Sequence, residues 1–115
     1  MVKVIRRGDV FLVNFRPARE DEASDVRPAV VVTNNLANQE GTTIVVVPIT
    51  SNTEKVYPFQ VHLPVERSGL NQDSKIQVEQ LRSISVSRLG KRLSHLPEDL
   101  MEELNRKIKL HLALI

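Results

Sequence analysis

The stretch Ala29-Val30-Val31-Val32-Thr33 is an unbroken run dominated by β-branched residues. Branching at Cβ restricts the side-chain rotamers and favours extended backbone. Because the apolar residues follow one another without alternation, we expect apolar packing on both sides of this segment. The run therefore predicts a strand that is buried on both faces of a sheet.

Two neighbouring segments are also expected to be strands. Residues 9–15 alternate bulky apolar side chains, which predicts a strand with one buried face. Arg16-Pro17 ends this strand, because proline has no N–H to donate to a ladder. Residues 43–50 form the next strand, and Pro48 within it indicates an edge strand or a β-bulge.

Three further short strands are expected at residues 59–63, 75–79 and 81–87. Clean alternation in the first of them predicts that Gln60 and His62 face solvent. The same period in the second predicts that Ile76 and Val78 point inward. The polar stretches between the strands are expected to be loops and turns.

One amphipathic helix is expected at the C-terminal end of the sequence. Pro97-Glu98-Asp99 is typical of a helix start, because proline suits the first turn and acids there complement the helix dipole. Apolar residues then recur every four positions and form one stripe: Leu100, Leu104, Ile108 and Leu112. Leu110, Leu114 and Ile115 lie partly off this stripe and indicate a second apolar surface suited to a dimer contact.

The order of these elements predicts a mainly β fold, a small antiparallel barrel closed by the amphipathic C-terminal helix. A length of 115 residues suits one domain, spanning residues 1–115. The first residues have no apolar signal-peptide core, and the longest apolar run, residues 44–49, is too short to cross a bilayer. A cytoplasmic protein with no membrane partner is expected.

The composition excludes several classes of site. The chain has no cysteine, and its three histidines are far apart in the sequence, so we expect no metal site. Glycine-rich phosphate loops and a G-x-S-x-G elbow are absent from the sequence, and no cofactor is expected.

The net charge of +2 permits a nucleic-acid partner without requiring one. Residues 75–92 carry five bases against one acid and could follow a phosphate backbone, whereas residues 20–25 hold four acids and no base.

Four segments of the chain resemble one known family. They are RGDVFLV at residues 7–13, VRPAVVV at 26–32, VPITSN at 47–52 and DSKIQVEQLRSI at 73–84. Each segment alone is a weak signal, but together they follow in order along a chain of the family's length. The sequence thereby resembles the MazF/PemK-type toxin endoribonucleases, the toxin half of toxin–antitoxin pairs.

The resemblance implies an SH3-like barrel, a homodimer and metal-independent cleavage of single-stranded RNA at a short sequence. It implies that Arg27, before the proline of the second motif, and Thr50, at the end of the third strand, are the catalytic residues. It places Gln80 near the substrate. It also implies a cognate antitoxin whose C-terminal segment covers the RNA groove.

The chemistry of these residue types agrees with that role. RNA can be cut by attack of its own 2′-OH on the adjacent phosphate, which requires alignment and stabilisation of extra negative charge. The planar guanidinium of Arg27 suits the charge, and the hydroxyl of Thr50 can donate to the same phosphate or orient the 2′-OH. Arginine is a poor base, so the general base is left unassigned. Taken alone, both residues also fit ordinary positions at the ends of strands.

Other residues are candidates for contacts with the substrate. Arg82 belongs to the basic stretch and could bind a phosphate, and Asn34 could contact a base edge. Ser51 and Asn52 follow Thr50 directly in the third motif. Glu22 keeps a position of the loop that follows the first strand in the family.

That loop departs from the family, which usually has Gly-Ser-Glu-Gln where this chain has Glu20-Asp21-Glu22-Ala23. The two additional acids should repel RNA phosphates over a screening length of ~8 Å. They could weaken the activity, shift the sequence preference, hold the loop away from the groove or supply the missing base. Alternatives of another class are a barrel that poisons a protein target such as gyrase by binding, and a module that only binds RNA or antitoxin.

Overall fold

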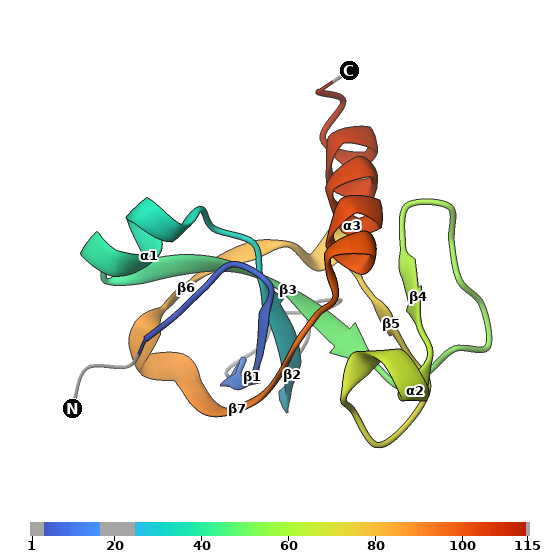
Figure 1. Ribbon diagram of the computed structural model, residues 1–115, viewed down its shortest axis with the longest axis horizontal. Coiled ribbons are helices and arrows are strands. Elements are labelled where there is room, and N and C mark those ends of the chain that lie inside the picture. Colours follow the sequence, from blue (N-terminus) through green and yellow to red (C-terminus); the bar gives the residue numbers. More distant parts are fainter. Residues whose placement is uncertain (1–3, 17–24, 115) are drawn as a thin grey trace.

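The computed structural model describes residues 4–16 and 25–114, which form one sheet with helices beside it (Figure 1). The strands are β1 (Asp9–Asn14), β2 (Val26–Val31), β3 (Thr43–Thr50), β4 (Val61–Leu63), β5 (Ser74–Ile76), β6 (Arg82–Ser85) and β7 (Leu89–His95). The α-helices are α1 (Asn35–Glu40), α2 (Val65–Ser68) and α3 (Glu98–His111), and two 3₁₀ turns are η1 (Val78–Gln80) and η2 (Val86–Arg88).

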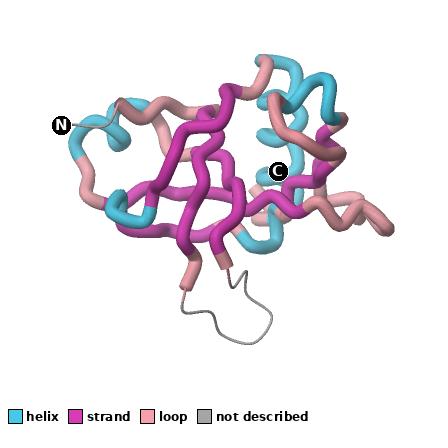
Figure 2. Tube along the Cα trace, turned by 90° about the horizontal axis from the view of Figure 1, so that it is seen from below, coloured by secondary structure: helices cyan, strands magenta, loops and turns pink. Residues whose placement is uncertain are grey.

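All the strand pairs are antiparallel, and the strands follow the order β4-β5-β3-β2-β1-β7, with β6 pairing with β3. Figure 2 shows these strands crossing the middle of the molecule, with helical segments to either side. The mainly β class and the C-terminal helix are confirmed. The sheet is not closed by hydrogen bonds, because β4 and β7 at its two ends do not pair within the described part of the chain.

Strand β3 has neighbours on both sides, so the expectation of an edge strand around Pro48 is wrong. Strand β2 pairs along one side of β3, from Val46 to Pro48. Along the other side, β6 pairs with the first half of β3, and β5 pairs with Ile49 and Thr50. Pro48 lies between the part of β3 that pairs with β6 and the part that pairs with β5. Because neither strand pairs with Pro48, its missing N–H removes no ladder hydrogen bond on that side of β3.

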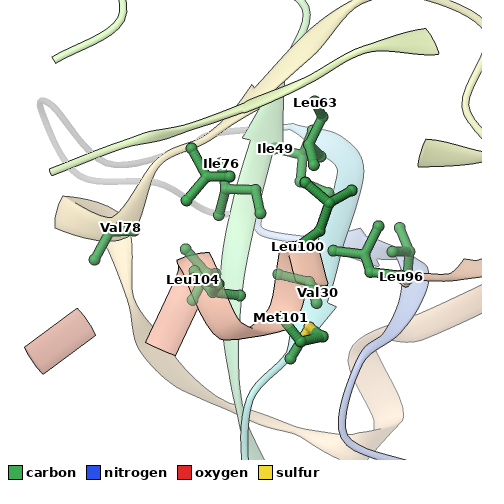
Figure 3. Packing of buried hydrophobic residues seen from close by; sticks show 12 residues of the cluster. Val30, Ile49, Leu63, Ile76, Val78, Leu96, Leu100, Met101 and Leu104 are labelled. Atoms are coloured by element: carbon green, nitrogen blue, oxygen red, sulfur yellow. The ribbon is translucent and has the colours of Figure 1, made fainter. Parts of the chain in front are cut away.

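Apolar cores cover both faces of the sheet. Val30 belongs to the core on the α3 side, together with side chains of β3, β4, β5 and α3 (Figure 3). Ala29 and Val31 belong to the second core, on the opposite face, with side chains of β1, β3 and β6. The prediction that the run beginning at Ala29 is buried on both faces is therefore confirmed.

The segment from residue 59 to residue 80 departs from simple alternation. Strand β4 begins only at Val61, and Gln60 is buried rather than exposed, because its amide nitrogen donates to both carboxylate oxygens of Glu79, at 3.0 and 2.8 Å. Strand β5 ends at Ile76, and η1 begins after one intervening residue, Gln77. Ile76 and Val78 are nevertheless both buried, as the period-two pattern predicted.

Helix α3 packs its first turns on the sheet and then extends beyond it (Figure 1). Leu100, Met101 and Leu104 are buried, whereas Leu112 is exposed, so the predicted stripe ends earlier than the sequence period indicates. Ile108 in the last turn still packs against the core, so the helix leaves the core only at its C-terminal end. No helix in the described residues has the length and apolar character needed to cross a membrane.

A buried carboxylate holds the start of β1. The side chain of Asp9 is 1% exposed and lies 2.8 Å from His95 Nδ1 and 3.1 Å from Arg92 Nε. It also accepts a hydrogen bond from the backbone N–H of Arg6, at 2.9 Å. Burial alone would raise the pKa of Asp9, but these hydrogen bonds outweigh it and hold the pKa below its ordinary value of 3.8. Gly8 has a φ of +97°, and a Cβ there would lie 3.0 Å from the ring of His95.

Replacement of Asp9 by asparagine should lower the free energy of unfolding at neutral pH by about 2 kcal/mol, because hydrogen bonds to a charged group are lost. The pKa of Asp9 is depressed in the folded protein, so its contribution to the free energy of unfolding is fully present above about pH 4. This contribution is lost as the pH falls through the depressed pKa. Urea denaturation across this range should show the difference between the two proteins shrinking in acid.

The matched control for this measurement is Glu102→Gln, which removes an exposed carboxylate from α3. Its unfolding curve should follow that of the wild type. Equal stability of Asp9→Asn and wild type at neutral pH would show that the buried carboxylate does not stabilise the fold.

Candidate active site

The register between β2 and β3 brings Arg27 and Thr50 together. Ala29 pairs with Pro48, and Val30 pairs with Val47. The paired residues stop at Ala29 and Pro48. Arg27, near the start of β2, and Thr50, at the end of β3, each lie two residues beyond that last pair, so a continuation of the same register would set them opposite each other. Residues directly opposite each other on antiparallel strands point to the same face. Both side chains accordingly line one cavity.

This cavity has a volume of about 440 Å³. Besides Arg27 and Thr50, the polar part of its lining is formed by Asp25, Ser51, Asn71, Gln72 and Ser74. The apolar part is formed by Leu12, Pro28, Ile49, Leu70 and Leu93. The cavity therefore offers hydrogen-bonding groups against an apolar wall, a combination that strengthens polar contacts with a bound group.

The guanidinium of Arg27 is held on two sides. Its Nε donates to Asp25 Oδ1 at 2.7 Å, and its Nη1 donates to Gln77 Oε1 at 3.4 Å. The hydrogen bond from Arg27 holds the pKa of Asp25 below its ordinary value. Among the described residues, these two bonds use two of the five N–H donors of the guanidinium.

The hydroxyl of Thr50 is oriented by the turn that follows β3. Its Oγ1 accepts a hydrogen bond from the backbone N–H of Asn52, at 3.2 Å. Because the oxygen accepts from the backbone, the hydroxyl hydrogen is available to donate elsewhere. The side chain of Asn52 accepts from the N–H of Glu54, also at 3.2 Å, which shapes the same turn.

A cation and a hydroxyl donor that face one cavity can bind a single anion together. A phosphate group fits this pair, since arginine binds phosphoryl oxygens with its planar fork and threonine adds a neutral donor. Within residues 4–16 and 25–114 there is no group of three or more histidine or acidic side chains placed to hold a metal ion.

Of the other predicted site residues, Ser51 lines the cavity and Asn52 lies at its edge through its bond to Thr50. Gln80 ends η1, the turn that follows Gln77, and is half-buried. Its backbone N–H donates to the carbonyl of Gln77, at 2.9 Å. Gln80 therefore belongs to the segment that also contacts Arg27.

Two predicted residues lie elsewhere on the fold. Arg82 pairs with Val46 on β3, four residues from Thr50 or ~13 Å along the strand, and its guanidinium lies 5.6 Å from the ring of Phe15. Asn34 caps α1, where its side chain accepts from the N–H of Ala37. It lies near the opposite end of β3 from Thr50. Glu22, like the acids at positions 20 and 21, lies outside the described residues.

Much of the basic stretch from residue 75 to residue 92 serves the fold. Lys75 is buried and donates to the carbonyl of Lys55. Arg88 donates to the carbonyl of Asn14 at 3.0 Å, and Arg92 bonds the buried carboxylate of β1. A continuous phosphate track made of all five bases does not form.

Asp25 and Gln77 were not among the residues that the sequence predicted for the site. A signal for each was present. Asp25 is two residues from Arg27, and alternate residues of a strand share a face. Gln77 lies between two apolar residues that were predicted to point inward, which placed its own side chain on the opposite face.

Known proteins of one family match nearly the whole chain. Residues 6–112 match a family model described as the PemK-like, MazF-like toxin of type II toxin–antitoxin systems. Endoribonuclease MazF9 of Mycobacterium tuberculosis is 45% identical, covering 96% of this chain and 98% of the relative. A crystal structure of MazF from Deinococcus radiodurans superposes with a TM-score of 0.85 at 27% identity, covering 97% of this chain and 99% of that one.

A crystal structure of MazE–MazF from the same organism superposes with a TM-score of 0.76 at 26% identity, covering 96% of this chain and 97% of that one. The family model spans both strands that carry Arg27 and Thr50, and the relatives are matched over nearly their whole length. The chain belongs to the PemK-like, MazF-like toxin family of type II toxin–antitoxin systems.

Proposed function

We propose that this toxin is a sequence-specific, metal-independent endoribonuclease that cleaves single-stranded RNA. The observation that carries the proposal is the convergence of Arg27 and Thr50 on one cavity from neighbouring strands. The relative MazF9, at 45% identity over nearly the full chain, is named an endoribonuclease, which supports the same activity.

In the proposed reaction the 2′-oxygen attacks the adjacent phosphorus and the bond from phosphorus to the 5′-oxygen breaks. The 2′-hydroxyl loses its proton and the 5′-oxygen gains one, leaving a cyclic phosphate and a free 5′-hydroxyl. Negative charge accumulates on the phosphoryl oxygens as the new bond forms, and Arg27 stabilises it. Thr50 donates its hydroxyl hydrogen to the same group. A guanidinium stays protonated in folded proteins, so Arg27 is not the base.

Substrate contacts are proposed at two distances from the cleaved phosphate. Ser51 lines the cavity, Asn52 bonds to Thr50, and Gln80 bonds to the backbone of Gln77. These three residues would contact the nucleotides next to the scissile bond. Arg82 would bind a phosphate further along the strand. Asn34 and Glu22 remain proposed contacts to bases.

The family implies a cognate antitoxin as partner, and a MazE–MazF assembly has been crystallised from Deinococcus radiodurans. We place the toxin in the cytoplasm, where its RNA substrate would be available. A homodimer is also proposed, with the exposed leucines at the end of α3 as one part of the contact.

Cleavage should depend on both catalytic residues. Arg27→Ala should slow the cutting of a long single-stranded RNA in the presence of EDTA by about 10²–10³-fold, because one preorganised donor to the developing charge is lost. Thr50→Ala should also reduce the rate strongly, whereas Thr50→Ser keeps the hydroxyl and should retain most of the activity. Sequencing the ends of the fragments should give one short recognition sequence.

Two outcomes would contradict the proposal. An Arg27→Ala protein that cuts as fast as the wild type would show that the cavity is not the active site. A wild-type protein that binds RNA or a protein target such as gyrase tightly, without cutting any RNA, would favour a toxin that acts by binding alone.

The dimer should depend on the apolar end of α3. Leu110 and Leu114 are 55% and 65% exposed, and each would gain about 1.5–3 kcal/mol on burial in a contact. Replacing both by lysine should weaken self-association at least ~100-fold in sedimentation equilibrium. The control is Leu36→Lys on α1, which is 73% exposed and should leave association unchanged. A double variant that dimerises like the wild type would place the contact elsewhere.

A further inference from the structure

We propose that Asp25 and Gln77 are positioning residues that orient the guanidinium of Arg27 toward the cavity beside Thr50. The proposal rests on the endoribonuclease function proposed above. It assigns the two residues no contact with the RNA. They act through Arg27, by fixing which of its donors remain free and where those donors point.

Asp25 holds the edge of the guanidinium nearest the backbone. Its Oδ1 accepts from Arg27 Nε at 2.7 Å, the length of a strong charge-assisted hydrogen bond. The side chain of Arg27 is 24% exposed and that of Asp25 is 52% exposed, so solvent reaches this ion pair. The carboxylate restrains one edge of the fork and leaves the outer nitrogens to other partners.

Gln77 restrains the guanidinium from another part of the sheet. Its backbone N–H donates to the carbonyl of Pro48 at 2.8 Å, which ties Gln77 to β3 two residues before Thr50. Its Oε1 then accepts from Arg27 Nη1 at 3.4 Å. Because the amide is neutral, it orients the guanidinium without cancelling its charge. Gln77 thus links the position of the Arg27 fork to the strand that carries Thr50.

The two restraints differ in their effect on RNA binding. A carboxylate beside Arg27 opposes the approach of a phosphate, so it weakens binding of the substrate in its ground state. The same carboxylate keeps the guanidinium in the geometry that the transition state needs. Removal of Asp25 should therefore lower kcat while KM falls or stays unchanged, a split that loss of a simple binding residue would not give.

The test is steady-state cleavage of one defined RNA by the wild type, Asp25→Ala, Asp25→Asn and Gln77→Leu, with Glu102→Gln on α3 as the charge-matched control. Asp25→Ala should lose about tenfold or more in kcat without a rise in KM. Asp25→Asn keeps an acceptor oxygen for Nε and should recover most of kcat while KM stays low. Gln77→Leu should lower kcat several-fold, and the control should match the wild type.

A second measurement needs no RNA. The side-chain N–H of Arg27 Nε should be protected from hydrogen exchange in the wild type when followed by NMR. Protection should be lost in Asp25→Ala and regained in Asp25→Asn, while circular dichroism shows that all variants are folded. This readout tests the positioning even if the wild type cuts no RNA, in which case the proposed function alone has failed.

Three results would overturn the inference. An unchanged kcat in Asp25→Ala would show that Arg27 needs no such restraint. An Asp25→Asn protein as slow as Asp25→Ala would mean that the carboxylate itself takes part in proton transfer. An Arg27 Nε–H that exchanges equally fast in the wild type and Asp25→Ala would mean that the ion pair does not hold the guanidinium.

Discussion

The antiparallel register between β2 and β3 is the constraint on which the site depends. A slip of one residue would turn every side chain of one strand to the other face and separate Arg27 from Thr50. Side chains far from the cavity prevent this slip. Val30 packs in one core, and Ala29 and Val31 pack in the other, so any change of register would bring side chains into the wrong core. The apolar run in β2 thereby fixes how Arg27 and Thr50 are placed at the cavity.

Pro48 gives β3 two successive partners and a link to the site. Its missing N–H falls where β6 ends its pairing and β5 begins, so the strand can change neighbours without losing a ladder bond on that side. Its carbonyl remains free to accept, and it receives the N–H of Gln77. The proline at which β3 changes partner thus also anchors, through its carbonyl, a residue whose side chain contacts Arg27.

Local patterns predicted the fold where burial is decided locally. The strands up to β6, the inward direction of Val78 and the start of α3 follow from residue types at short spacing. Strand β7 was not predicted, and α1 lies in a polar stretch that was expected to be a loop. Gln60 could not be predicted, because its burial depends on the carboxylate of Glu79, which is 19 residues away. Leu112 continues the apolar period of α3 but is exposed, because the helix has passed the core at that point. The period in the sequence does not show where the core ends.

The sequence pointed to two residues that line one cavity, Arg27 and Thr50, but not to the ion pair beside them. Arg27 and Thr50 followed from the family motifs, whereas Asp25 counted only as one of the four acids between residues 20 and 25. In the structure, the carboxylate of Asp25 lies 2.7 Å from Nε of Arg27 and forms an ion pair with it. Such a pair acts at a distance as a dipole, whose field falls off faster than that of a lone charge. A count of acids in the sequence therefore overstates the repulsion that a phosphate meets at this cavity, because part of the negative charge is already matched by Arg27.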